Sequence, residues 1–169
     1  MTRAVILAAL LAGQVLAFPV LAEGTLEGRL VTFTVETWDD PAAPIFIARG
    51  RTVMVGSGVE FGLDREGGTA GLDVVPVTVE IGPTRIELSY PAGIGRFYVA
   101  KFNGYVLRFE TDCALFDAVA VDPKGTTMPV KPGDVRAEGG ALFINVSGLG
   151  YGPSSTLAID LAVADCPLS

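Results

Sequence analysis

The sequence predicts a single exported all-β domain: an antiparallel β-sandwich with one disulfide. Short runs rich in β-branched and aromatic residues alternate with polar residues, and 21 glycines and 11 prolines punctuate them. After residue 22, no window of about twelve residues carries the apolar stripe of an amphipathic helix. Because strands and helices do not alternate, a parallel sheet is not expected. The strand order stays open, and a jelly-roll-like order is one alternative.

Residues Met1–Ala22 have the three-part pattern of a cleavable signal peptide. The parts are a basic start at Arg3, an apolar stretch over Ala4–Leu16 that is followed by a break at Pro19, and a cleavage site at Val20-Leu21-Ala22. Val15-Leu16-Ala17 is an alternative cleavage site. A membrane anchor is the weaker interpretation, because Pro19 interrupts the apolar run before the ~20 residues that a spanning helix needs. We therefore expect a mature domain over residues 23–169 with no transmembrane segment.

Charge and cysteine content suggest where the mature domain works. Without Arg3 the chain keeps 11 basic and 19 acidic residues, a net charge of −8. Such an acidic surface disfavours binding to nucleic acid. Cys113 and Cys166 are expected to form a disulfide in an oxidising compartment, with a pair of free thiols as the alternative. Together these features predict a periplasmic or secreted protein.

The first half of the domain is expected to contain six strands. Thr25–Thr37 is a long run with Leu30, Phe33 and Val35 as candidate core residues, and a loop with two prolines, Trp38–Pro44, follows it. In Thr84–Tyr90, three apolar residues alternate with polar ones, which is typical of a strand with one wet face. Between the strands lie a charged, glycine-rich loop, Asp64–Gly71, and a hairpin candidate at Gly82-Pro83. The other strands in this half are expected over Ile45–Val55, Gly58–Leu63, Val75–Ile81 and Arg96–Phe102.

The second half is expected to contain five strands. Asn103-Gly104 is the strongest hairpin signal in the chain, so we predict a tight turn there, and a second turn at Gly139-Gly140. In Ala141–Ser147 and Thr156–Ala164, the apolar residues alternate with polar ones, so one face of each strand is expected in the core. The remaining strands are expected over Tyr105–Thr111, Ala114–Val121 and Val135–Ala137.

Several phrases resemble a family of bacterial secreted and surface β-sandwich proteins, many of which carry an exosortase sorting tail. The phrases are Val53–Phe61 (VMVGSGVEF), Phe102–Leu107 (FNGYVL) and Ile144–Tyr151 (INVSGLGY) with Ser155–Leu161 after it. The resemblance implies an extracellular β-sandwich and no particular activity. This chain ends in Cys166-Pro167-Leu168-Ser169 instead of a hydrophobic tail, which favours a free periplasmic or secreted form.

The residue types restrict the available chemistry. Because the chain has no histidine, Ser-His-Asp and Cys-His nucleophiles and histidine-ligated metal sites are excluded. A carboxylate-based glycosidase needs two acidic side chains across a cleft, and Glu80 and Glu87 could face each other across the Gly82-Pro83 hairpin. Alternating glutamates on a strand are more commonly its solvated face, so we expect no catalytic activity. The further acidic candidates are Asp39, Asp40, Glu60, Asp64, Glu66 and Asp73.

Two kinds of binding site remain open. Oxygen ligands in acidic loops can hold a structural calcium, and Asp39, Asp40, Asp64 and Glu66 are weak candidates. Exposed aromatic rings can stack on sugars, so a binding surface could include Trp38, Tyr98, Tyr105 and Tyr151; the plainer interpretation has these rings packed at the edge of the core. Asn145-Val146-Ser147 matches a glycosylation sequon, but we interpret Asn145 as a polar strand residue.

The leading hypothesis is a non-catalytic binding or structural module of the envelope or extracellular space, with a glycan or an envelope protein as its partner. It predicts a loop cluster or sheet face with a large apolar patch. The alternative is a glycoside hydrolase that acts on envelope polysaccharide. Self-assembly through an exposed edge strand is a third option.

Overall fold

A computed structural model describes residues 24–62 and 75–168 of this chain. The described residues form thirteen β-strands and one short 3-10 turn, Pro132–Asp134. Every strand pairing is antiparallel. The predicted all-β, antiparallel class is therefore confirmed. The signal peptide Met1–Ala22 and the loop residues Asp64, Glu66 and Asp73 lie outside the described residues, and no helix in the described ranges is long and apolar enough to cross a membrane.

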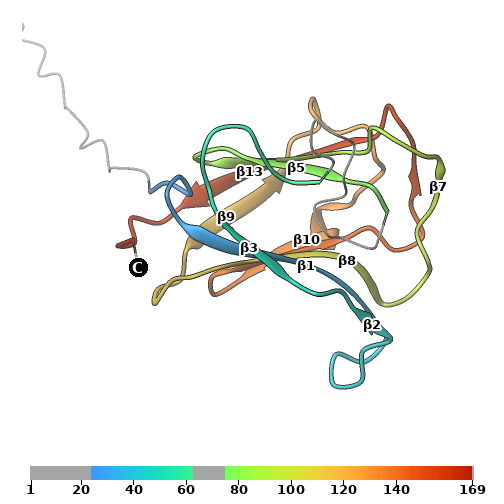
Figure 1. The fold of residues 1–169 in the computed structure, drawn as a ribbon, viewed down its shortest axis with the longest axis horizontal. Coiled ribbons are helices and arrows are strands. Elements are labelled where there is room, and N and C mark those ends of the chain that lie inside the picture. Colours follow the sequence, from blue (N-terminus) through green and yellow to red (C-terminus); the bar gives the residue numbers. More distant parts are fainter. Residues whose placement is uncertain (1–23, 63–74, 169) are drawn as a thin grey trace, which may run out of the picture.

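The first sheet has six strands in the order β10-β11-β8-β1-β2, and β3 also pairs with β1. The long strands β1 and β8 pair over eight residues, from Val31 opposite Phe109 to Trp38 opposite Phe102. These two strands form the centre of the sheet, below β5 and β13 in Figure 1. The strand bounds are β1 Leu30–Trp38, β2 Phe46–Ile47, β3 Arg51–Met54, β8 Phe102–Phe109, β10 Val135–Glu138 and β11 Ala141–Asn145.

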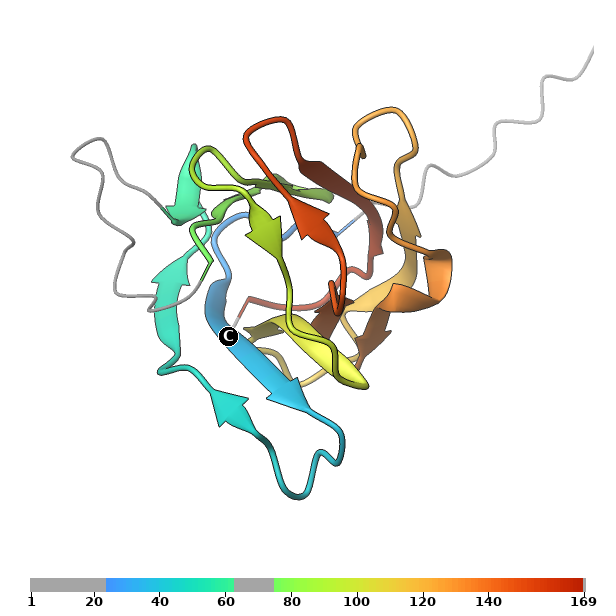
Figure 2. The same ribbon diagram turned by 90° about the vertical axis from the view of Figure 1, so that its right-hand side faces the viewer.

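The second sheet has five strands in the order β4-β5-β6-β13-β9, and a two-stranded ribbon, β7 with β12, lies at one end of the molecule. Figure 2 looks at that end, where β2 and β7 both face the viewer. The described chain starts and finishes at the opposite end. The strand bounds are β4 Val59–Phe61, β5 Thr78–Ile81, β6 Arg85–Ser89, β7 Gly95–Arg96, β9 Phe116–Val121, β12 Gly150–Tyr151 and β13 Thr156–Val163.

The core lies between the two larger sheets, as the alternating pattern predicts. Ring stacking crosses it: Phe33 of β1 lies between Phe61 of β4 and Tyr105 of β8, with centroids 4.9 and 5.5 Å away. Of the proposed core residues of the first strand, Leu30 is only half-buried. The remaining candidates are buried: Phe33, Val35, Ile86, Leu88, Tyr90, Leu142, Ile144, Val146, Leu157, Ile159, Leu161 and Val163.

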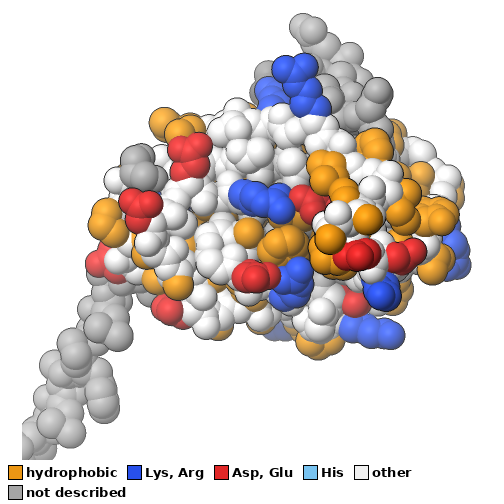
Figure 3. Space-filling model, turned by 90° about the horizontal axis from the view of Figure 1, so that it is seen from below, with side chains coloured by type: hydrophobic (Ala, Val, Ile, Leu, Met, Phe, Trp, Pro, Cys, Tyr) orange, Lys and Arg blue, Asp and Glu red, His pale blue; other side chains and the backbone are white. Residues whose placement is uncertain are grey.

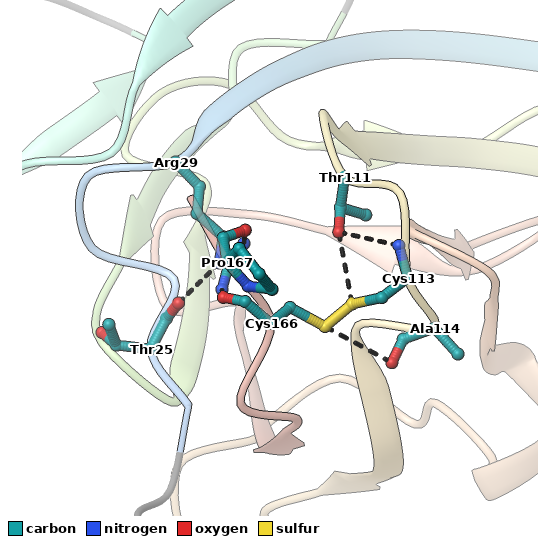
Figure 4. The surroundings of a disulfide bond; sticks show 7 residues. All are labelled: Thr25, Arg29, Thr111, Cys113, Ala114, Cys166 and Pro167. Atoms are coloured by element: carbon teal, nitrogen blue, oxygen red, sulfur yellow. Dashed lines mark hydrogen bonds between the residues drawn. A yellow bond between two sulfur atoms is a disulfide. The ribbon is translucent and has the colours of Figure 1, made fainter. Parts of the chain in front are cut away.

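The predicted disulfide, Cys113–Cys166, is present and joins the segment before β9 to the chain that follows β13. A buried guanidinium secures the same region (Figure 4). Arg29 donates from Nε to Thr25 O at 2.7 Å, from Nη2 to Cys166 O at 2.6 Å and from Nη1 to Pro167 O at 3.2 Å. Arg29 thus joins the first part of the described chain to the last part, and the disulfide joins that last part to the segment before β9.

The hairpin predicted at Asn103-Gly104 is wrong, because β8 runs straight through both residues. Tertiary packing overrides the turn propensity here. A side chain at position 104 would overlap Ile144 O of the neighbouring strand β11, so glycine allows the two strands to approach. The Asn103 amide donates to Tyr98 O at 2.8 Å, and its oxygen accepts from the Thr37 hydroxyl at 2.9 Å.

Two other local expectations need correction. The single strand expected over Ile45–Val55 is split into β2 and β3, which pair with different parts of β1. The Gly82-Pro83 hairpin does join β5 to β6, but the N–H of Gly82 donates to Arg85 O at 2.8 Å. Pro83 and Thr84 are therefore the central turn residues, and Pro83 occupies the first of these positions, where its fixed φ fits a common turn. The Gly139-Gly140 turn between β10 and β11 is confirmed.

Candidate functional site

Large apolar side chains are exposed together at the β2 and β7 end of the molecule. Their exposed fractions range from 42% for Phe46 to 85% for Ile94. Figure 3 shows hydrophobic side chains gathered at this right-hand end. We call this surface the apolar end and define it by Ile45, Phe46, Ile47, Ile94, Tyr98 and Val99.

The backbone fixes the β2 part of the apolar end at the edge of the first sheet. Ile45 N donates to Thr37 O at 2.9 Å and Ala48 N to Val35 O at 2.8 Å, one on each side of β2. A turn closed by Asp40, whose carboxylate accepts from Ala42 N, leads into this strand. Three consecutive apolar side chains are therefore presented from an ordered edge strand with only two ladder residues.

The β7 part of the apolar end is held by hydrogen bonds to the chain around β12. Phe97 N donates to Leu149 O at 2.9 Å, and the hydroxyl of Ser147 both accepts from Ala100 N and donates to Ala100 O. Ile94, Tyr98 and Val99 lie on the chain between and beside these anchors. Their exposure thus belongs to a fixed surface and not to a free loop.

A cavity of about 230 Å³ opens within the apolar end. Its walls come from both sides of that end: Phe46 from β2, Tyr98 from the chain after β7, and the core-facing side chains Val35, Phe97 and Tyr105. We call it the end cavity. The remaining lining residues are Thr37, Val75, Arg96, Asn103 and Gly104.

An aromatic cluster lies next to the end cavity. The Phe97 ring has its centroid 5.0 Å from Tyr151, 5.9 Å from Tyr90 and 6.3 Å from Tyr105. The hydroxyls of Tyr90 and Tyr105 are buried, and neither has a hydrogen-bond partner of good geometry among the described residues. Burial raises the pKa of both hydroxyls, and the two lie close enough to influence each other.

The four aromatic residues named from sequence occupy different places. Tyr98 is exposed on the apolar end, whereas Tyr105 is buried and contributes a wall of the end cavity. Tyr151 is half-buried in the aromatic cluster. Trp38 is half-buried on the outer face of the first sheet, where it stacks on Phe102 with centroids 4.9 Å apart.

The outer face of the first sheet carries charged groups beside these rings. Phe102 contacts Phe143 edge-on at 6.2 Å, and the Arg136 guanidinium lies 4.0 Å from the centre of the Phe143 ring. Arg108 on the same face pairs with Glu36 at 2.9 Å. On this face, Arg108 is therefore paired with Glu36 and Arg136 with the Phe143 ring, so neither guanidinium lacks a partner.

The Glu80 and Glu87 carboxylates do lie on directly opposed residues of β5 and β6. Both line a groove of about 200 Å³. Arg85 donates to Glu87 at 2.6 Å and also pairs with Asp122 and Asp160. Hydrogen bonds from the Lys124 N–H and from Arg85 lower the pKa of Asp122. The Arg85 guanidinium thereby relieves the repulsion that two opposed glutamates would otherwise suffer.

Of the acidic candidates for calcium, the structure describes Asp39 and Asp40. Asp39 accepts a hydrogen bond from Lys101 N and Asp40 one from Ala42 N, so both carboxylates bind the backbone. Asp64 and Glu66 lie outside the described residues. Within residues 24–62 and 75–168, no three acidic or cysteine side chains are grouped as metal ligands.

Two polar residues in the phrases that resemble secreted β-sandwich proteins, Glu60 and Asn145, make hydrogen bonds within the fold. Glu60 accepts from Gly56 N at 3.1 Å and from Ile81 N at 2.7 Å, which joins the turn before β4 to the end of β5. Asn145 accepts from Asn103 N and Ser147 N and donates to Lys101 O. Glu60 and Asn145 therefore hold neighbouring segments of the fold together.

No family model, curated protein sequence or solved structure gives a significant match to this chain. The resemblance to secreted β-sandwich proteins stays a prediction. The site is therefore argued from its own geometry. Sequence reasoning named Tyr98 and Tyr105 but missed the rest of the site, although the consecutive Ile45, Phe46 and Ile47 beside a proline-rich loop were a readable signal.

Proposed function

We propose that this protein is an exported, non-catalytic binding module of the periplasm or extracellular space, and that the apolar end is its binding surface. The observation that carries the proposal is the gathering of six large exposed apolar side chains at the apolar end, two of which, Phe46 and Tyr98, line the end cavity. Large apolar patches on soluble monomers mark binding surfaces. The Cys113–Cys166 disulfide fits an oxidising compartment.

The composition of the apolar end favours an envelope protein over a glycan as the partner. Sugars are held by flat aromatic rings together with hydrogen-bonding side chains, whereas four of the six residues here are aliphatic. Aliphatic side chains on a rigid surface stabilise a complex by excluding water from another apolar surface.

The proposal is tested by binding of the purified mature protein to detergent-solubilised envelope proteins, with Ile47→Ser and Leu168→Ser as a matched pair. Both residues are aliphatic and about equally exposed, at 55% and 60%. Leu168 lies near the C-terminus, at the opposite end of the molecule from β2. We expect saturable binding of a discrete protein that Ile47→Ser weakens at least about fivefold and Leu168→Ser leaves unchanged. Equal effects of the two changes would count against the apolar end.

A glycoside hydrolase is the second candidate, because β5 and β6 place Glu80 and Glu87 side by side in a groove. Against it, Glu87 is half-exposed and paired with Arg85, whereas a general acid needs surroundings that keep it protonated. Incubation with a panel of envelope polysaccharides separates the two functions. Turnover that disappears in Glu80→Gln or Glu87→Gln would establish the hydrolase and overturn the binding module.

A further inference from the structure

We propose that the end cavity binds a small apolar carboxylate, whose apolar group lies among Val35, Phe97 and Tyr105 and whose carboxylate pairs with Arg96. The inference deepens the proposed function, since it names a ligand for the cavity within the same apolar end. It depends on three features of the cavity: its size, its apolar walls and the charge at its rim.

The size of the cavity fits one ring with a short side chain. An engineered apolar cavity of about 150 Å³ holds a benzene molecule. The end cavity is larger, at about 230 Å³, which leaves room for two or three further heavy atoms. Its walls of Val35, Phe46, Phe97 and Tyr105 offer such a group aliphatic and aromatic contacts on several sides.

Of the polar side chains that line the cavity, only Arg96 carries a charge that could bind a ligand. The Thr37 hydroxyl donates to Asn103 Oδ1 at 2.9 Å, and the Asn103 amide donates to Tyr98 O at 2.8 Å, so these two side chains satisfy each other and the backbone. Arg96 has no acidic side chain within 4.0 Å among residues 24–62 and 75–168. Arg96 is exposed and lines the cavity, so its attraction for an anion adds to the contacts that the apolar walls make.

The Arg96 side chain is held in position for this role. Its residue pairs with Gly150 across the β7 and β12 ribbon. Its Nη1 donates to Gly148 O at 2.5 Å, which fixes one edge of the guanidinium. The other N–H groups of the planar fork remain for a carboxylate, a group that the fork matches in geometry.

The inference is tested by calorimetric titration of the mature protein with 3-phenylpropionate. The neutral 3-phenylpropionamide and sodium acetate serve as probes of the charge and of the apolar group. We expect the acid to bind with a dissociation constant of about 1 mM or tighter. The amide and acetate should each bind at least about tenfold more weakly, because each lacks one of the two interactions.

A pair of variants assigns the charge to one residue. Arg96→Met keeps an unbranched apolar stem and removes the charged guanidinium, so we expect the acid to bind at least about tenfold more weakly while the amide is unaffected. Lys124→Met removes a cation from the turn after β9, away from the cavity lining, and should change neither. Far-ultraviolet circular dichroism of each variant confirms that the fold is retained.

Failure of this inference is distinguishable from failure of the proposed function. No saturation by the acid, equal binding of acid and amide, or an unchanged affinity in Arg96→Met would each overturn the carboxylate site. Ile47 does not line the cavity, so Ile47→Ser should weaken partner binding and leave acid binding intact. Loss of partner binding in Ile47→Ser alongside a failed acid titration would retain the binding module and discard its small ligand.

Discussion

At the scale of single residues, this protein relies on polar groups that are buried with their partners. Arg29 is the clearest example, because its guanidinium is buried and satisfies three backbone carbonyls from both ends of the described chain. The aromatic cluster beside the end cavity is the exception. There, the Tyr90 and Tyr105 hydroxyls are buried without a hydrogen-bond partner of good geometry among the described residues, which costs stability.

Replacement of Arg29 by leucine should destabilise the domain by about 2–3 kcal/mol, because three buried carbonyl oxygens lose a charged donor. Urea unfolding of the oxidised protein, followed by the fluorescence of Trp38, measures this loss. Lys124→Leu, a change in an exposed turn, is the control and should have little effect. A midpoint unchanged in Arg29→Leu would show that the clasp drawn in Figure 4 does not stabilise the fold.

The buried tyrosines predict a dependence of stability on alkaline pH. Their pKa values are raised in the folded protein, chiefly by burial. The folded state therefore holds these protons more tightly than the unfolded chain, whose tyrosines titrate near pH 10. The free energy of unfolding should be constant below that pH and fall above it, by up to about 1.4 kcal/mol per pH unit for each tyrosine.

Tyr105→Phe isolates one tyrosine of the pair. Because its hydroxyl has no hydrogen-bond partner of good geometry in residues 24–62 and 75–168, the change should cost less than about 1 kcal/mol at pH 7. It should also make the loss of stability between pH 10 and 11 about half as steep. Urea unfolding at four pH values measures both effects, and an unaltered slope would contradict the burial of this hydroxyl.

At the scale of elements, the sequence predicted strands better than turns. Period-two alternation identified β6, β11 and β13 and the faces they bury, because alternation reports burial directly. The turn propensity of Asn103-Gly104 gave a wrong hairpin, since the sequence does not show that Ile144 O approaches position 104 from another strand. The apolar end was missed for the same reason: Phe46 and Tyr98 are far apart in sequence and meet only through the sheet pairing.

The corrected role of Gly104 gives a direct test at this scale. Gly104→Ala should destabilise the domain by roughly 2–4 kcal/mol or prevent folding, because the added methyl group would overlap Ile144 O between β8 and β11. Gly56→Ala is the control, since its added methyl would meet no atom within 4 Å. Soluble yield and urea unfolding measure the difference. Equal stability of the two variants would favour the turn that the dipeptide predicts.

At the scale of the whole molecule, the two ends of the sandwich differ in what they do. One end contains the disulfide, the Arg29 clasp and both limits of the described chain, and so stabilises the fold (Figures 1 and 4). The other end presents the exposed apolar side chains and the end cavity. This separation places the exposed apolar groups of the proposed binding surface at one end and the covalent closure of the fold at the other.

Removal of the disulfide should therefore reduce stability without altering the binding end. The double change Cys113→Ser and Cys166→Ser should lower the free energy of unfolding by about 2–5 kcal/mol, because the bond closes a loop with a sequence separation of 53 residues. Binding of 3-phenylpropionate at 15 °C should stay within about twofold of the parent protein. A selective loss of binding in the folded variant would show that the two ends are coupled.

Photo-crosslinking in the cells that make the protein tests whether the apolar end contacts a protein partner. A photoreactive residue replaces Ile47 or Tyr98 at the apolar end, or Leu168 or Lys124 elsewhere on the surface. We predict one discrete protein adduct from positions 47 and 98 and none from positions 168 and 124. The same adduct from all four positions, or no adduct from either apolar-end position, would contradict the claim.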